Sequence, residues 1–244
     1  AISFEKLYVE TPQISSITSD ELEINPSISA LLARKPGGKV TATGFLNGSV
    51  VISMHPTPSS EKGLDKSKFE ITASNISLKE ARQISNISLP LKGELSLTSQ
   101  AVVDLALVEQ PELDLSLTIS KFELASTFIP LHDFGQILLP EIKFGKVEIK
   151  GRLSNGKFLI ENAKLGTTND DLYGDIKGEL SITLQNMNGL VTPLLGAYNI
   201  SIDLKATQSF KDRAKLFLSF LDGYKVDAGT LSSYKFKVSS TEMG

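Results

Sequence analysis

Strict alternation of apolar and polar residues most constrains how this chain can fold. In residues 172–185, Leu, Gly or Ile occupies every second position, and polar residues or Tyr stand between them. Successive side chains of a β-strand point to opposite faces, so this segment predicts a strand with one apolar and one polar face. Residues 147–153 show the same pattern. The Ser154-Asn155-Gly156 turn that follows predicts a hairpin, because Asn and Gly adopt positive φ at little cost.

Shorter alternating runs predict further strands along the chain. They lie at residues 2–9, 22–24, 40–46, 50–54, 69–73, 89–97, 103–107, 113–119, 200–206 and 234–238. Asn47-Gly48 predicts a second hairpin turn. Helical spacing or caps predict short helices at 28–34, at 77–87 after a Ser77/Glu80 capping box, and at 210–224. We interpret 126–139 as a short helix with a connection, and 187–196 as a loop or helical turn.

These few helices are too short to cover the apolar face of about ten strands. The sequence therefore predicts a mainly β fold: an antiparallel sheet curled around an open apolar groove, in the manner of a taco. A two-sheet β-sandwich is the alternative, because periodicity alone does not separate a groove from a closed core.

Two motifs occur twice in the same order. Residues 38–48 match 145–156 in their glycines and in the Leu-(Ser)-Asn-Gly turn, and residues 91–98 match 176–183 almost position for position. Repeated β units stack or extend one sheet, because a single unit does not bury its own apolar face. We expect one β domain over residues 1–244, with repeat units at approximately 38–120 and 145–206.

Residues that could carry out chemistry are sparse. The chain has no cysteine and a net charge of −3, which argues against thiol chemistry, a Cys-ligated zinc site and nucleic-acid binding. His55 and His132 show no metal-ligand spacing, and Asn169-Asp170-Asp171 is typical of a turn rather than of a calcium loop. We expect no enzymatic activity, no cofactor and no metal.

The glycine pattern of the second repeat resembles a known family. The residues that carry it are Gly145, Val147, Gly151, Leu153, Asn155, Gly156, Leu165, Gly166, Asp171, Gly174, Ile176, Gly178 and Leu180. This series is similar to the C-terminal signature of the N component of the type II (general) secretion pathway, which is related to AsmA-like envelope proteins. Pro90-Leu91-Lys92-Gly93 resembles a strand in the middle of the same family.

The resemblance implies a periplasmic β domain of a Gram-negative bacterium. It would be anchored to the inner membrane by an N-terminal helix that this chain lacks, and its partners would be the envelope proteins of the secretion system. AsmA-like domains are similar to curled open sheets that carry lipids or bridge the two envelope membranes. The family supplies no catalytic residue to carry over.

The apolar positions of the strands are the candidate site for phospholipid or another acyl lipid. They are Leu91, Leu95, Leu97, Leu113, Leu115, Leu117, Ile119, Val147, Ile149, Ile176, Leu180, Ile182, Ile200, Ile202 and Leu204. Two alternatives remain at this point. One is a purely structural scaffold that pairs through strand edges, and the other is a secreted β-sandwich binding module. The absence of Trp and the scarcity of Tyr count against the module.

Overall fold

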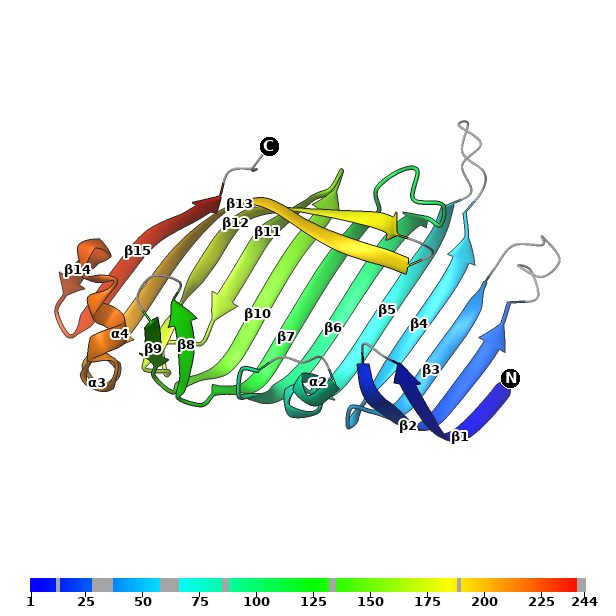
Figure 1. Cartoon of the computed structure of the whole chain (residues 1–244), viewed down its shortest axis with the longest axis horizontal. Helices are drawn as coiled ribbons and strands as arrows, with labels where there is room; N and C mark the ends of the chain where they lie inside the picture. The colour runs from blue at the N-terminus through cyan, green and yellow to red at the C-terminus, as the bar shows by residue number, and fades with distance from the viewer. Residues whose placement is uncertain are drawn as a thin grey trace.

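One large antiparallel sheet makes up most of the protein. The computed structural model describes residues 1–11, 14–27, 37–57, 66–84, 88–131, 135–187 and 190–240. In these ranges the large sheet has 13 strands, in the order β1-β2-β3-β4-β5-β6-β7-β10-β11-β12-β13-β15-β14 (Figure 1). The sheet curls but its two end strands do not meet, so the mainly β, open arrangement is confirmed. The described residues form no second large sheet, and the sandwich is not what this chain adopts.

The strands of the large sheet are long, and successive strands are neighbours almost throughout. They are β1 (Ile2–Thr11), β2 (Ile14–Pro26), β3 (Gly38–Phe45), β4 (Gly48–Pro56), β5 (Lys66–Ser77), β6 (Leu91–Asp104), β7 (Glu112–Leu124), β10 (Ile142–Ser154), β11 (Lys157–Leu165), β12 (Leu172–Met187), β13 (Leu190–Thr207), β14 (Lys225–Ala228) and β15 (Leu231–Ser240). Two further strands, β8 (Thr127–Leu131) and β9 (Gly135–Leu139), form a separate hairpin.

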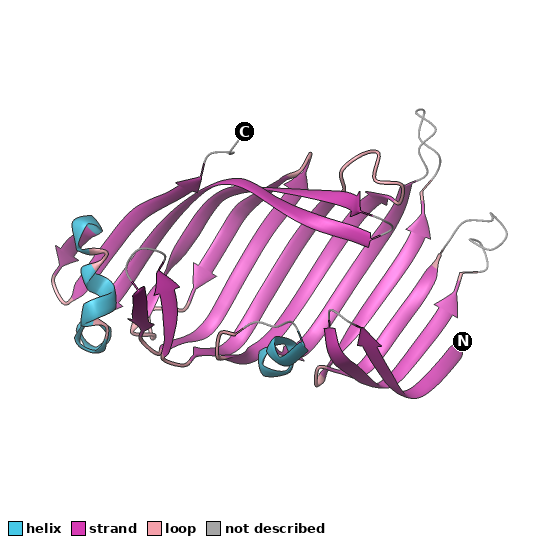
Figure 2. Cartoon of the chain, in the orientation of Figure 1, coloured by secondary structure: helices cyan, strands magenta, loops and turns pink. Residues whose placement is uncertain are grey.

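The helices are short and lie at the margins of the sheet (Figure 2). They are α2 (Leu78–Ile84), α3 (Gln208–Arg213), α4 (Lys215–Ser219) and the 3-10 turn η1 (Asp222–Tyr224). The predicted cap of α2 is present, because the Glu80 amide donates to Ser77 Oγ over 3.3 Å. The helix predicted at 28–34 lies outside the described residues.

Of the two predicted hairpin turns, one is correct and the other is displaced by one residue. Between β10 and β11 the central residues are Asn155 and Gly156, at φ 50° and 72°, as predicted. Between β3 and β4 they are Leu46 and Asn47, one position earlier than predicted. Gly48 instead begins β4, where an added Cβ would lie 2.3 Å from the Ser74 carbonyl oxygen. The close approach of β5 explains why glycine occupies this strand position.

The sequence repeat maps onto comparable but unequal parts of the sheet. The first motif forms the β3–β4 and β10–β11 hairpins, and the second lies in β6 and β12. Gly93 and Gly178, at the same position of the second motif, have φ of 141° and 146°. However, β5 lies between β4 and β6, whereas β12 lies directly beside β11. The second copy therefore has no counterpart of β5.

Helices α3 and α4 close the C-terminal end of the concave face (Figure 1). Phe210, Ala214 and Leu218 pack in one buried cluster with sheet residues that include Val147 and Tyr234. The Thr207 hydroxyl accepts the Phe210 amide and so caps α3. This cluster is the main core among the described residues, and it fixes two helical turns against the sheet.

Three predictions of local structure are wrong. The single helix predicted at 210–224 is divided into α3, α4 and η1, because Ala214 has a non-helical backbone (φ −114°, ψ 20°). In residues 126–139, the described segments pair as β8 and β9 instead of forming a helix, and each strand supplies backbone hydrogen-bond partners to the other. In residues 187–196, Met187 ends β12 and residues 190–195 pair with β12 as part of β13, rather than forming a helical turn.

Candidate functional site

An unbroken row of apolar residues crosses the concave face. In an antiparallel pair, residues opposite each other in register project to the same face. Following the register from strand to strand gives one ladder with a member in every strand of the large sheet except β14. Its residues, which we call the central ladder, are Phe4, Leu22, Ala42, Val50, Ala73, Leu97, Leu117, Ile149, Ala163, Ile176, Ile202 and Phe236.

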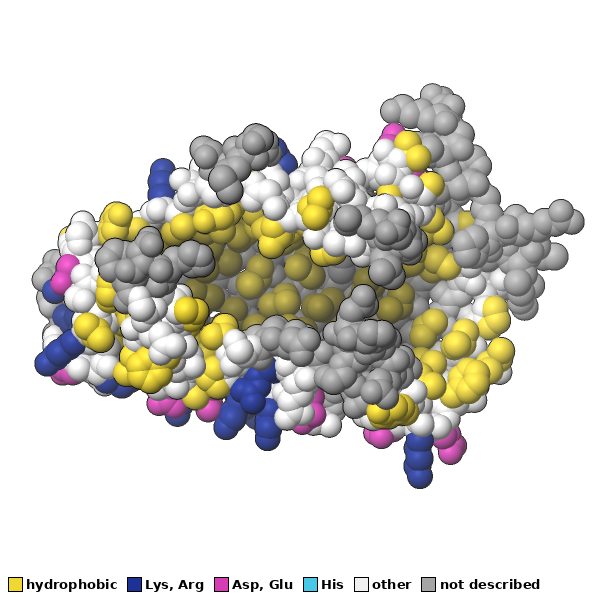
Figure 3. Space-filling view, in the orientation of Figure 1, with side chains coloured by type: hydrophobic (Ala, Val, Ile, Leu, Met, Phe, Trp, Pro, Cys, Tyr) yellow, Lys and Arg dark blue, Asp and Glu magenta, His cyan; other side chains and the backbone are white. Residues whose placement is uncertain are grey.

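Parallel ladders widen this row into a floor. On one side run Ile2, Ile24, Val40, Ile52, Ile71, Ser99, Leu115, Gly151, Ile160, Gly178, Ile200 and Val238. On the other side run Ile76, Leu95, Ile119, Val147, Leu165, Gly174, Leu204 and Tyr234. Figure 3 shows the result as a hollow whose floor is formed by hydrophobic side chains.

The structure brings nearly all of the candidate residues together on this floor. Leu95, Leu97, Leu115, Leu117, Ile119, Val147, Ile149, Ile176, Ile200, Ile202 and Leu204 lie in the three ladders just given. Leu113 and Leu180 belong to a fourth ladder on the same face, with Leu153, Phe158 and Tyr198. Leu91 pairs with Leu124 beyond a bulge at Lys92–Glu94, and Ile182 pairs with Leu195 beyond a second bulge.

Several floor residues were missed by the sequence interpretation. Phe158, Ile160 and Ala163 lie on the floor in β11, but a register shift between Ile160 and Ala163 interrupts their alternation. Tyr198 and Phe236 lie on it in β13 and β15. The bulge in β11 explains the omission, because an extra residue moves the following side chains out of a strict period of two.

Most of the floor is only half-buried, although it is apolar. Among the candidate residues, Val147 alone is fully buried, and it lies under the α3–α4 cluster. The floor continues to β1, where Ile2 and Phe4 are exposed at the sheet edge. The groove is therefore closed by protein at its C-terminal end, and among the described residues it ends at the edge strand β1 on the other side.

The convex face has the opposite character. Register neighbours of alternate phase are mostly polar or charged, with Val51, Leu159 and Tyr173 among the exceptions. They include exposed ion pairs such as Arg152–Asp114 at 2.8 Å and Lys235–Asp203 at 3.7 Å. Exposed pairs of this kind contribute little to stability. Their effect is to keep one face of a single-layer sheet compatible with water, which leaves the concave face as the apolar surface.

Two rims border the groove. One rim is formed by an extension of β12 and β13, residues 181–187 and 190–195, which we call the rim hairpin. The other rim is formed by β8, β9 and α2 (Figure 1). The rim hairpin is attached to two turns of the sheet. The Ile182 amide donates to the Gly156 carbonyl at 2.8 Å, and the Gln110 side chain bonds both the Leu184 amide (2.8 Å) and its carbonyl (3.1 Å).

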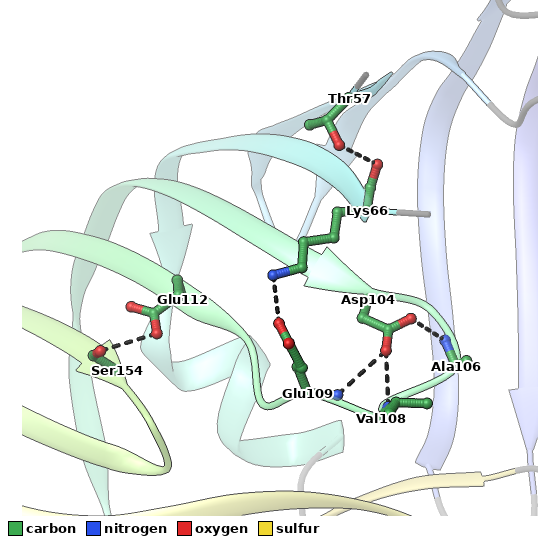
Figure 4. A network of polar contacts seen from close by, with 8 residues as sticks. All are labelled: Thr57, Lys66, Asp104, Ala106, Val108, Glu109, Glu112 and Ser154. Carbon is green, nitrogen blue, oxygen red and sulfur yellow. Dashed lines mark hydrogen bonds and ion pairs between the residues drawn. The ribbon is translucent and has the colours of Figure 1, made fainter. Parts of the chain in front are cut away.

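A polar network holds the loop that carries Gln110 (Figure 4). The buried carboxylate of Asp104 accepts the amides of Ala106 (2.9 Å), Val108 (2.8 Å) and Glu109 (3.2 Å). Lys66 joins the β5 end of the network to Glu109 at 2.6 Å. Asp104 therefore fixes residues 105–109, and through them the attachment of the rim hairpin.

Asp104 should make the stability of this rim depend on pH. The Ala106 amide above all, then the Glu109 and Val108 amides and the Lys66 charge, hold the pKa of Asp104 below its ordinary value, whereas burial acts to raise it. A carboxyl group whose pKa is lower in the folded state stabilises the fold at pH values above its pKa in the unfolded chain, about 3.9. This contribution is lost as the pH falls toward and through its pKa in the folded state.

We therefore expect Asp104→Asn to lower the Tm by several degrees at neutral pH, with the difference from the wild type shrinking below about pH 4. Thermal melts at stepped pH would measure it. Asp114→Asn, which removes an exposed partner of Arg152, is the control and should change the Tm little. A constant difference for Asp104→Asn across the acid range would contradict the assignment.

Among the described residues, no group of His, Cys, Asp or Glu is arranged to hold a metal ion, and no described helix is long and apolar enough to cross a membrane. His55 is exposed in β4 and pairs in register with Lys68, while His132 lies outside the described ranges. Asp170 acts as a turn residue, accepting the Thr167 amide at 2.7 Å.

Comparison with models of protein families, with curated proteins and with solved structures gave no match for this chain. The function must therefore be argued from the groove itself.

Proposed function

We propose that the protein is a non-enzymatic lipid-handling component, and that its concave groove holds the acyl chains of a phospholipid or a similar lipid. The central ladder is the observation that carries this proposal. An apolar row that crosses the sheet without a charged member, and that stays partly exposed, is unusual for a water-soluble surface. Acyl chains are a ligand that such a surface would favour without any polar recognition.

The dimensions of the groove suit acyl chains. Neighbouring strands lie about 4.8 Å apart, so the central ladder is about 50 Å long. One leaflet of a bilayer has a hydrocarbon depth of about 15 Å, half of the roughly 30 Å core, so chains lying along the ladder would have ample room. The α3–α4 cluster blocks one end, which leaves the mouth and the β1 end for entry and exit.

Binding would be passive. Each buried methylene contributes about 0.8 kcal/mol, so a chain of ten or more methylenes provides enough driving force without a hydrogen bond or a charge. Affinity should therefore rise with chain length and depend weakly on the headgroup. This behaviour would set the groove apart from a site built around a specific polar contact.

The compartment and partners belong to the same proposal. The resemblance of residues 145–180 to the N component of type II secretion supports a periplasmic location, attachment to the inner membrane, and envelope proteins of the secretion system as partners. In that setting the groove would hold lipid or conduct it between the two membranes. The curled open sheet is compatible with the relation to AsmA-like proteins that the resemblance implies.

A structural scaffold is the second candidate. The observation in its favour is β1, an end strand of the described sheet, whose apolar side chains Ile2 and Phe4 are exposed. Unpaired edge amides can accept a strand from another protein, which would extend the sheet. A scaffold would use the edge and leave the floor unoccupied.

Titration with a fluorescent fatty acid separates the two candidates. We expect saturable binding, competition by unlabelled fatty acids in order of chain length, and no competition by glycerol phosphate. Binding without chain-length dependence, or no binding to freshly delipidated protein, would overturn lipid handling and leave the scaffold.

A further inference from the structure

The rim hairpin displays apolar side chains to solvent. Leu195 is 76% exposed and Val191 is 58% exposed, and Leu194 is exposed as well. Leu195 pairs with Ile182 on the concave side of the bulge, so this surface continues from the groove floor. An exposed aliphatic strip of this kind marks a contact surface more often than a random feature.

The sequence of the rim hairpin has no charge. From Leu180 to Ile202 there is no Asp, Glu, Lys, Arg or His, and this is the longest charge-free stretch of the chain. The opposite rim is similar, since β8 and β9 expose Phe128 and Leu138. The mouth of the groove thus has exposed apolar side chains on both rims, and α2 adds Lys79, Glu80 and Arg82 to the second rim.

Part of the backbone of the rim hairpin is hydrogen-bonded within the protein. Its strands pair with each other in register from Ile182 opposite Leu195 to Met187 opposite Leu190. On the other edge of β12, the Ile182 and Leu184 amides are bonded to Gly156 and Gln110. These bonds lower the cost of bringing this part of the backbone close to the apolar region of a bilayer, and they fit insertion of side chains at headgroup level rather than entry of the whole hairpin.

We propose that the rim hairpin docks on the surface of a lipid bilayer, with Val191 and Leu195, which share one face of β13, inserted at the level of the headgroups. A bilayer suits this surface because the stretch from Leu180 to Ile202 carries no charge, and its exposed aliphatic side chains continue from the floor that is proposed to hold acyl chains. The inference deepens the proposed function and rests on it: docking at the mouth lets acyl chains pass from the bilayer to the groove without crossing water.

Flotation with phosphatidylcholine vesicles tests the inference. We expect the full chain to float with neutral vesicles and to remain bound at about 1 M salt, where charge interactions reach only about 3 Å. The double variant Val191→Asp, Leu195→Asp should lower vesicle partitioning at least tenfold, because each change replaces an inserted aliphatic group with a charge.

Leu159→Asp is the matched control. Leu159 is 47% exposed on the convex face, opposite Arg152 and Glu179 in register, so its replacement should leave partitioning unchanged. Fatty-acid titration without vesicles should give the same affinity for the hairpin variant and the wild type. That readout separates failed docking from a failed groove, because loss of both would place the defect in the groove.

Three results would overturn bilayer docking. Equal partitioning of the hairpin variant and the wild type would show that these side chains are not inserted. Binding that needs anionic lipid and disappears in high salt would assign it to the lysines of the convex face. In the third result, the wild type fails to bind vesicles and forms oligomers in light scattering. If Leu159→Asp also forms them and the double hairpin variant does not, this rim is a contact between copies of the chain.

Discussion

Replacing Phe210 by alanine is expected to lower the free energy of unfolding by about 3–5 kcal/mol. Phe210 is 0% exposed, and it fills the cluster between α3 and the sheet with Leu218 and Tyr234. The Arg213 guanidinium lies 5.1 Å from its ring centroid, so a cation–π contact would be lost as well. Because this cluster is the main core of the described fold, its loss should also loosen the closed end of the groove.

Urea denaturation followed by circular dichroism would measure this effect. Phe220→Ala is the matched control, since Phe220 follows α4 in the same segment but is 54% exposed. Its replacement should change stability by less than about 0.5 kcal/mol. Similar losses for the two variants would mean that α3 and α4 do not pack on the sheet as described.

The second large effect is expected for the middle of the central ladder. Leu117→Asp places a charge between Leu97 and Ile149, on the floor where a bound chain would lie. Desolvating that carboxylate against an acyl chain is costly, so the affinity for a fluorescent fatty acid should fall at least tenfold. Leu117→Asn, which adds polarity without charge, should weaken binding in the same direction by a smaller factor.

Ser116→Asp is the control for this prediction. Ser116 is the neighbouring residue on the opposite face and lies across from Lys150 in register, so a new carboxylate there meets a favourable charge. Binding by Ser116→Asp should match the wild type, and melting curves would verify that all three variants are folded. An undiminished affinity of folded Leu117→Asn and Leu117→Asp would exclude the floor as the binding surface.

Much of the sheet follows from local pattern. The alternation in residues 172–185 correctly predicts both the strand and its two faces, because a period of two leaves no choice of which side chains share a face. The same reasoning placed thirteen of the fifteen candidate residues in four adjoining ladders. Asn155-Gly156 was predicted correctly because its conformational preference is local.

Features that depend on distant contacts were not predictable in the same way. The β8–β9 hairpin and residues 187–196 of the rim hairpin were interpreted as helical or irregular, because prolines and broken periodicity hide the strand pattern there. Lys121 adopts φ 52° beside the bulge at Lys92–Glu94, and this register shift has no signature in either strand alone. Whether the apolar face is open or closed depends on the curvature of the whole sheet, which no segment encodes by itself.

Native mass spectrometry of the protein purified from a bacterial envelope tests the central claim most directly. The account predicts extra mass at near-stoichiometric occupancy, and organic extraction should identify it as phospholipid or fatty acid. The extra mass should be lost from folded Leu117→Asp and kept by Ser116→Asp. A lipid-free mass for wild-type protein that has never been exposed to detergent would contradict the claim, because the exposed apolar floor would then have bound no acyl ligand while lipid was present.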